Sequence, residues 1–304
     1  MQILIPTEIT AAMFTSSTVA EPASTETTWV SAGTYVIGDK RIRTGTHREY
    51  RCILGHTGRT ALPEDDTTYW EDYGPTVKWA PWDIYVSTPA VGASPLTHVV
   101  SPGFADSVSF YGLVGSSLTL TVKDGPGGAT IDTRTESLYA ESLGLYEYLF
   151  GPKFQKSKVI FTDIPIHPTA EFTATITGSG TMQLGMFNLG TYTSILGDDW
   201  GGPQYGASVE PMTYSRIRTD ADTGRVSIRR GNAATGMRVS VVLPTEDANN
   251  ALDIVQRVLD VPVSWVASSE QHYEGLNVFG LGSASLTYET VGMTRLSITV
   301  KGMI

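Results

Sequence analysis

Residues 117–123 read Ser-Leu-Thr-Leu-Thr-Val-Lys, and this stretch indicates the fold class most clearly. Its apolar and polar side chains alternate with a period of two, as they do in a β-strand that buries one of its faces. The next five residues, Asp-Gly-Pro-Gly-Gly, have the composition of a turn. The stretch therefore predicts a half-buried strand that ends in a tight turn.

Similar strand patterns lie on both sides of this one, separated by turns rich in Gly and Pro. Within residues 91–206, strands are predicted at 108–114, 117–123, 159–164, 171–177 and 182–189. Strands at nearly regular spacing are typical of a β-sandwich or jelly roll, so we predict a β-sandwich domain of that kind here. Residues 138–150 are expected to hold a short helix.

The last third of the chain, residues 207–304, predicts a β-rich α+β domain with one amphipathic helix. Its predicted strands lie at 213–218, 225–229, 237–243, 263–267, 276–281, 285–289 and 294–301. Thr245 is suited to the N-cap of the helix, and one helical face carries Ala248, Leu252, Val255 and Leu259. Pro262 is expected to end this helix.

The first ninety residues predict three short segments. Residues 1–28 are rich in Thr, Ser, Ala and Glu and read as an extended arm. Residues 29–73 are dense in aromatic and turn residues, which predicts a small β module whose aromatic side chains supply much of its core. Residues 74–90 are expected to form a linker that packs onto the β-sandwich domain after it. The chain as a whole is predicted to be mainly β.

The charge of the chain argues against a nucleic-acid partner. Its formal net charge is −10, whereas affinity for nucleic acids comes largely from Lys and Arg that neutralise phosphates. One group of arginines is the exception: Arg216, Arg218, Arg225, Arg229 and Arg230. We interpret this group as one face of a hairpin, with a local basic patch as the alternative.

The single cysteine, Cys52, excludes an intrachain disulfide and a zinc site built from several cysteines. The N-terminal residues have no basic segment and only a three-residue apolar run, so we expect no signal peptide. No apolar run approaches the roughly 20 residues that a spanning helix needs. We therefore expect a soluble protein that does not insert into a membrane.

The sequence offers no pattern that points to catalysis, so we expect no enzyme activity, no catalytic residues, no metal and no cofactor. It has no phosphate-binding Gly-rich loop, no G-x-S-x-G elbow and no His-Glu-x-x-His. Two carboxylate groups have a chemical alternative. Glu64-Asp65-Asp66 is expected to be a solvated loop rather than a glycosidase pair, and Asp220-x-Asp222-x-Gly224 a hairpin turn rather than a calcium loop.

The aromatic segment reads Trp29-x5-Tyr35-x2-Gly-Asp and continues to Tyr50, Pro63 and Trp70. It resembles the small chitin-binding modules of carbohydrate-binding families 5 and 12, over about 45 residues. The resemblance implies that some aromatic side chains stack on sugar rings while others form the small core. The candidates for glycan or protein binding are Trp29, Tyr35, Tyr50 and Trp70, and the sequence does not divide them between the two roles.

A second resemblance rests on short stretches spread over nearly the full chain: Leu4-Ile-Pro-Thr, Thr15-Ser-Ser-Thr-Val-Ala-Glu, Thr46-His-Arg-Glu-Tyr50, Asp72-Tyr-Gly-Pro-Thr76, Trp79…Trp82-Asp83, Val159-Ile-Phe-Thr-Asp-Ile-Pro165, Tyr205-Gly-Ala-Ser-Val209, Tyr214-Ser-Arg216 and Leu296-Ser-Ile-Thr-Val-Lys-Gly302. In these stretches, which keep their order, the chain is similar to tail-associated proteins of long-tailed phages. The chain departs from the family pattern at Trp79-Ala-Pro-Trp82 and carries a local insertion near residues 198–202.

This second resemblance implies a structural component of a phage tail tip or baseplate, located in the virion tail and assembled in the host cytoplasm. Its expected partners are other copies of itself and the hub, fibre and other tail-tip proteins. The alternative is an adhesin that recognises host cell-surface glycan through residues 29–73. A cell-wall hydrolase is a third interpretation, but the sequence offers no acid/base pair for it.

Overall fold

The computed structural model describes residues 1–140, 144–151, 153–195, 203–204, 206–268 and 273–303. The protein is mainly β, with 48% strand and 9% helix, and one 12-residue helix lies near the C-terminus. The predicted fold class is therefore confirmed. The proposed insertion at residues 198–202 lies outside the described residues.

The chain forms two compact units, and neither follows the predicted boundaries. The first unit contains Met1–Thr7, Asp106–Val108 and Leu189–Ile304, and the second contains Glu8–Ala105 and Ser109–Asn188. The units are discontinuous because strands distant in sequence pair with each other. Pairing of that kind leaves no mark in local composition, which is all that the sequence offers for placing boundaries.

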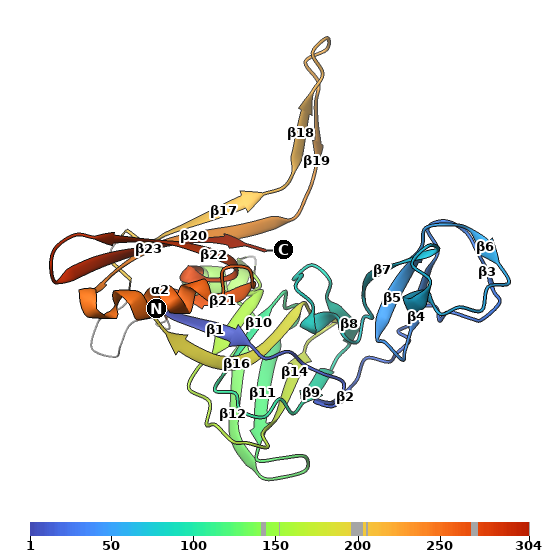
Figure 1. Ribbon diagram of the computed structural model, residues 1–304, viewed down its shortest axis with the longest axis horizontal. Helices are drawn as coiled ribbons and strands as arrows, with labels where there is room; N and C mark the ends of the chain where they lie inside the picture. The colour runs from blue at the N-terminus through green and yellow to red at the C-terminus, as the bar shows by residue number, and fades with distance from the viewer. Residues whose placement is uncertain (141–143, 152, 196–202, 205, 269–272, 304) are drawn as a thin grey trace. The chain divides into compact units, whose positions relative to one another are not determined.

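The largest sheet is a curled, nine-stranded antiparallel half-barrel (Figure 1). Its strands are, in spatial order, β13 (Lys158–Phe161), β10 (Ser107–Tyr111), β16 (Met186–Ser194), β1 (Gln2–Pro6), β21 (Val263–Val266), β22 (Asn277–Tyr288), β23 (Met293–Gly302), β20 (Ala233–Pro244) and β17 (Ser208–Thr213). β13 and β17 are its edges.

The N-terminal residues form a central strand of this sheet, although the sequence predicted an extended arm. β1 pairs with β16 on one side and with β21 on the other, and Ile3 and Leu4 are fully buried. In a short strand that is buried on both faces, apolar and polar residues do not alternate along the sequence. The short apolar run of β1 was therefore not recognised as a strand. Deletion of these residues would therefore remove part of the core.

The 12-residue helix near the C-terminus consists of a 3₁₀ turn, η3 (Thr245–Asp247), and the α-helix α2 (Ala248–Gln256). Asp247, not the predicted Thr245, occupies its N-cap position, and neither end is capped by a side-chain hydrogen bond. Ala248 and Val255 are buried as predicted, whereas Leu259 is 41% exposed because the regular helix ends before it. The helix packs on β22 and shares a core with Trp265.

Trp265 restricts which residues the neighbouring strand β22 can carry. Its indole Nε1 donates a hydrogen bond to the Gly280 carbonyl at 3.1 Å. A Cβ atom at Gly282 would lie within 3 Å of the ring, so only glycine fits there. Trp265 is one of the largest fully buried side chains of the protein.

A second, five-stranded sheet contains the stretch that indicated the fold class. Its order is β12 (Thr130–Ser137), β11 (Ser117–Lys123), β14 (Glu171–Thr177), β9 (Leu96–Val100) and β2 (Phe14–Ser17). β11 buries Leu118, Leu120 and Val122 and leaves its polar residues half-buried, which confirms the alternation. β15 (Thr181–Leu184) and β8 (Ala90–Ala93) form a separate two-stranded sheet.

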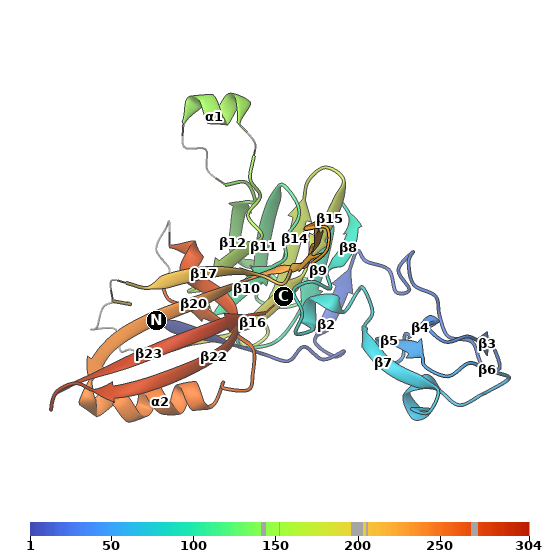
Figure 2. The same ribbon diagram turned by 90° about the horizontal axis from the view of Figure 1, so that it is seen from above.

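The short helix expected within residues 138–150 is α1 (Leu145–Phe150), which begins later than predicted, and Tyr139 forms an isolated bridge with Gln155 instead. Figure 2 shows α1 beyond the end of β12. No helix of the described residues is long and apolar enough to span a membrane.

The aromatic segment folds into two small sheets. β4 (Lys40–Arg43), β5 (Arg48–Cys52) and β7 (Trp70–Pro75) form one, and β3 (Thr34–Tyr35) and β6 (His56–Thr57) form the other. Short 3₁₀ turns, η1 (Pro63–Asp65) and η2 (Ala80–Trp82), precede and follow β7, and η4 (Glu274–Leu276) precedes β22. A hairpin of β18 (Arg216–Thr219) and β19 (Val226–Arg229) completes the fold.

Candidate functional site

Three of the four candidate aromatic residues form the core of the small module. Tyr35 and Tyr50 are 5% exposed and Trp70 is 1% exposed, and they surround the buried Cys52. The ring of Tyr35 meets that of Trp70 edge-on, with centroids 4.9 Å apart. These side chains are thus committed to packing, and a sugar ring has no access to their faces.

Two hydrogen bonds hold Tyr35 in place. Its hydroxyl donates to the Val30 carbonyl and accepts from the Val30 amide, both at 2.8 Å. The hydroxyl therefore closes the loop that enters the module.

The buried Cys52 lies in the same core, and its burial raises the pKa of its thiol.

Trp29, the fourth candidate, is half-buried at the edge of this core. The guanidinium of Arg43 lies 5.4 Å from its ring centroid, and Arg43 is also paired with Glu64 at 3.2 Å. The indole Nε1 of Trp29 is buried and has no hydrogen-bond partner among the described residues. Because the side chain as a whole is only half-buried, Trp29 is the one candidate that remains partly available to a ligand.

The most exposed aromatic residue of the module is Tyr73, which the sequence analysis did not single out. It is 50% exposed, and the ammonium group of Lys40 lies 3.4 Å from its ring centroid. Strand alternation does not predict this exposure, because the register skips Tyr73 at a β-bulge: Tyr50 pairs with Asp72 and Glu49 pairs with Gly74.

Ion pairs cover the surface of the module. The pairs are Lys40–Glu49, Arg41–Asp39, Arg43–Glu64, Arg48–Asp72, Arg51–Glu71 and Arg59–Asp66. Two members of the Glu64-Asp65-Asp66 group are thus engaged by arginines. These contacts balance the charge of the module within itself.

The segment predicted as a linker, residues 74–90, packs through an aromatic cluster. Trp79 and Trp82 lie 5.0 and 5.4 Å from Phe14, measured between ring centroids. His47, whose backbone has a positive φ of 56°, stacks on Trp79 at 4.5 Å and contacts the Glu21 carboxylate at 3.0 Å. Trp79-Ala-Pro-Trp82, where the chain departs from the phage family pattern, is therefore a packed 3₁₀ turn.

Two titratable groups of this region have shifted pKa values, both because of burial. His98 is fully buried, and desolvation lowers its pKa to about 4. Its Nε2 lies 3.3 Å from the Lys78 carbonyl oxygen, an acceptor, so Nε2 carries the proton of the neutral ring. Asp83 shows the opposite shift: burial raises the pKa of its carboxyl to about 6.

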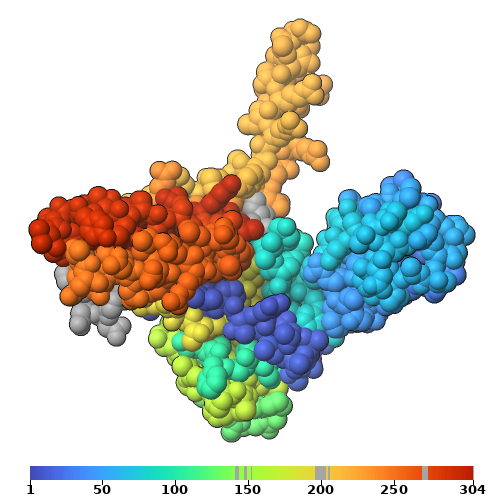
Figure 3. Space-filling view, viewed as in Figure 1, coloured from blue at the N-terminus to red at the C-terminus, as the bar shows by residue number. Residues whose placement is uncertain are grey.

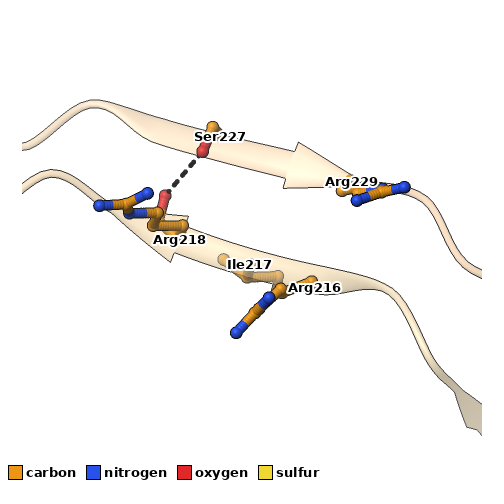
Figure 4. A pocket seen from close by; sticks show the side chains of 5 residues that line it. All are labelled: Arg216, Ile217, Arg218, Ser227 and Arg229. Carbon is orange, nitrogen blue, oxygen red and sulfur yellow. Dashed lines mark hydrogen bonds between the residues drawn. The ribbon is translucent and has the colours of Figure 1, made fainter.

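Three members of the arginine group, Arg216, Arg218 and Arg229, lie in the strands of the β18–β19 hairpin (Figure 4), and Arg225 and Arg230 flank β19. Arg216 pairs with Arg229 in the register, and Arg218 pairs with Ser227, so these four residues share one face. The Ser227 hydroxyl donates to the Arg218 carbonyl at 3.2 Å. The opposite face carries the Ile217–Ile228 and Thr219–Val226 pairs.

All eight strand residues of the hairpin are exposed. Ile217 is 66% exposed, Ile228 63% and Val226 54%. In Figures 1 and 3 the hairpin extends away from the sheet strands β17 and β20 that lead into it. The predicted hairpin is confirmed, and it exposes a basic face and an apolar face together.

The turn of the hairpin contains the Asp220-x-Asp222 motif. One Asp220 carboxylate oxygen accepts hydrogen bonds from the Asp222 and Thr223 amides, at 2.9 and 3.1 Å. These bonds lower the pKa of Asp220. The geometry is that of a turn. Among the described residues, no group of three His, Cys, Asp or Glu side chains could hold a metal ion.

Comparisons of the chain with protein-family models, with curated proteins and with solved structures found no match. The resemblances to carbohydrate-binding modules and to phage tail proteins therefore stay predictions from the sequence.

Proposed function

We propose that this chain is a structural subunit of a bacteriophage tail tip or baseplate, repeated symmetrically around the tail axis. It would anchor or neighbour the tail fibres and contact hub and other tail-tip proteins, without catalytic activity or a cofactor. The place of action would be the virion tail, after assembly in the host cytoplasm. The sequence resemblance along nearly the whole chain suggests this role.

The exposed β18–β19 hairpin is the structural observation that carries the proposal. An isolated two-stranded hairpin is marginally stable in water at best. This one also exposes Ile217, Val226 and Ile228, which would favour burial against a partner. A subunit of a larger assembly provides such a partner.

Helix α1 and the residues after it supply a second surface of the same kind. The exposed fractions of Leu145, Tyr146, Leu149, Phe150 and Phe154 range from 58% to 75%. A helix whose apolar side chains point outward in this way is suited to burial by another protein. Repeated copies around an axis would bury such surfaces in equivalent contacts.

Phage particles that encode this chain provide the test. Quantitative mass spectrometry of purified tails should find it at a fixed ratio to the other tail proteins, and antibody labelling should place it at the tail tip. Its absence from washed particles, or a copy number that varies between preparations, would overturn the proposal.

A carbohydrate-binding adhesin is the second candidate, favoured by the partly available Trp29 and the exposed Tyr73. Exposed aromatic rings offer flat apolar faces to sugar rings. The full chain would be compared with its Trp29→Ala and Tyr73→Ala variants for binding to a glycan array and to host cells. An adhesin predicts that at least one variant loses binding while it retains its thermal midpoint. Unchanged binding by both variants would contradict sugar recognition at this edge of the module.

A further inference from the structure

We propose that the arginine face of the β18–β19 hairpin binds the acidic face of helix α2 on a second copy of this chain. This inference rests on the proposed function, because it requires that copies lie side by side. It names the two surfaces that meet and the charge that joins them.

The first argument is the charge of the hairpin against that of the rest of the chain. Residues 214–232 contain five arginines and two aspartates, a net charge of +3. The remaining residues contain 16 basic and 29 acidic side chains, a net charge of −13, and together these give the −10 of the whole chain. A second copy therefore presents a surface of the opposite sign, which favours association.

The second argument is the lack of partners for the hairpin arginines. Eight arginines of the chain form ion pairs: Arg41, Arg43, Arg48, Arg51, Arg59, Arg134, Arg238 and Arg295. The five hairpin arginines form no ion pair with a carboxylate in the described part of the chain. Among the described residues, Arg257 is the one other arginine without an ion pair. The unpaired positive charge is thus concentrated on one exposed hairpin.

The third argument is a matching acidic surface on helix α2. Glu246 and Asp247 lie in the turn before the helix, Asp253 in the helix and Asp260 just after it, and all four side chains are exposed. None of them forms an ion pair with a residue that the structure describes. Within the helix, Asp253 lies on the side opposite the buried Ala248, Ala251 and Val255. The exposed Arg257 follows one turn later on that side, so the four acidic residues and Arg257 together carry a net charge of −3.

The hairpin cannot reach the helix of its own chain. It leaves the sheet at the Thr213–Ala233 pair, at one end of β20, whereas η3 and α2 begin after Pro244 at the other end. The 12 residues of β20 separate the base of the hairpin from the start of η3 by about 36 Å at roughly 3.3 Å per residue. Figure 1 shows the hairpin directed away from α2, so the acidic helix that it meets must belong to another copy.

Charge reversal on each surface tests the contact in the full chain. Arg216→Glu/Arg218→Glu/Arg229→Glu reverses the hairpin, and Asp253→Arg/Asp260→Arg reverses the helix. We expect each set alone to raise the Kd of self-association roughly tenfold or more in sedimentation velocity, and the two sets together to restore it. The matched control, Arg216→Lys/Arg218→Lys/Arg229→Lys, keeps the charge and should associate as the original chain does. All these positions are exposed, so thermal midpoints should be unchanged.

Recovery of self-association in the combined variant supports the proposal. If none of the charge reversals changes the Kd of self-association, the proposal is overturned. The tail-tip function is unaffected by that result if the chain is still found at a fixed ratio in particles. A chain that stays monomeric up to about 1 mM also overturns it. If the hairpin reversal abolishes retention on DNA or heparin but leaves self-association unchanged, the occupant is a polyanion and the proposal fails.

Discussion

The aromatic module, residues 29–73, and the β18–β19 hairpin are both small β structures rich in arginine, and they differ in where their side chains find partners. The module buries Tyr35, Tyr50 and Trp70 and pairs its arginines with its own carboxylates. The hairpin exposes all eight of its strand residues, and its arginines have no carboxylate partner among the described residues.

The contrast separates stability from recognition. A structure with a buried core and internal ion pairs gains its stability within the chain. A structure that exposes Ile217 and Ile228 beside unpaired arginines gains little from its own contacts, so its residues are available to a partner. We therefore expect substitutions in the module to change folding and substitutions in the hairpin to change assembly.

The largest expected effect is that of Trp70→Ala. Trp70 is 1% exposed, and truncation of a buried aromatic side chain costs about 3–5 kcal/mol, which should unfold the module. Ile228→Ala in the hairpin should change the free energy of unfolding by no more than about 0.5 kcal/mol. Denaturant unfolding measures both, with the exposed Tyr73→Ala as the control within the module. Equal losses of unfolding free energy for Trp70→Ala and Ile228→Ala would contradict the contrast between the module and the hairpin.

The next effect is pH dependence, which should come from buried groups. The pKa of His98 is about 4 in the folded chain and 6.5 in the unfolded chain, so the unfolded state binds a proton first on acidification. His98 therefore costs stability as the pH falls below 6.5, by about 2 kcal/mol between pH 7 and pH 5. His98→Gln should remove that part of the acid sensitivity.

The effect of Asp83 on the pH dependence of stability is opposite to that of His98, so the experiment needs a control for Asp83. Its pKa is raised to about 6, so its stabilisation is complete below 3.8 and is lost as the pH rises through 6. The effect of His98→Gln is best measured in an Asp83→Asn background, by chemical unfolding at pH 5 and pH 7. Equal pH dependence with and without His98 there would contradict the assignment.

A smaller effect is expected for the ion pairs that cover the module. Arg43 and Glu64 lie 3.2 Å apart, and their side chains are 26% and 23% exposed. Partly exposed pairs of this kind contribute about 0.2–1 kcal/mol. A double-mutant cycle with Arg43→Ala and Glu64→Ala measures their coupling. A coupling of several kcal/mol would show that the charge pairs, and not the aromatic core, hold the module together.

The smallest expected effect is that of a chelator. Asp220 accepts backbone hydrogen bonds in the hairpin turn, so EDTA should move the thermal midpoint by less than about one degree. Magnesium-free and calcium-free buffers provide the reference. A fall of several degrees that calcium reverses would identify the turn as a calcium loop.

Local patterns in the sequence predicted much of this fold. The alternation of β11, the helix after Pro244 and the hairpin around Asp220 are all present, because each depends on residues close together in the chain. The central position of β1 was missed because it depends on pairing with β16 and β21, far away in sequence.

The candidate site was predicted less well. The sequence identified the aromatic residues of the module but could not tell Trp70, which is buried, from Trp29, which is half-buried, since both are large and apolar. It also identified the hairpin arginines, whereas their lack of partners becomes visible only when the positions of the carboxylates are known. Burial and pairing are properties of the folded chain.

Hydrogen exchange of the full chain, measured for the isolated protein and for the assembled particle, tests the central claim most directly. Amides of β18 and β19 should exchange rapidly in the isolated chain and slow by roughly tenfold or more on assembly. Amides of β5 in the module should be protected in both states. Rapid exchange of the hairpin in the assembled particle, with new protection appearing only in the module, would contradict the account.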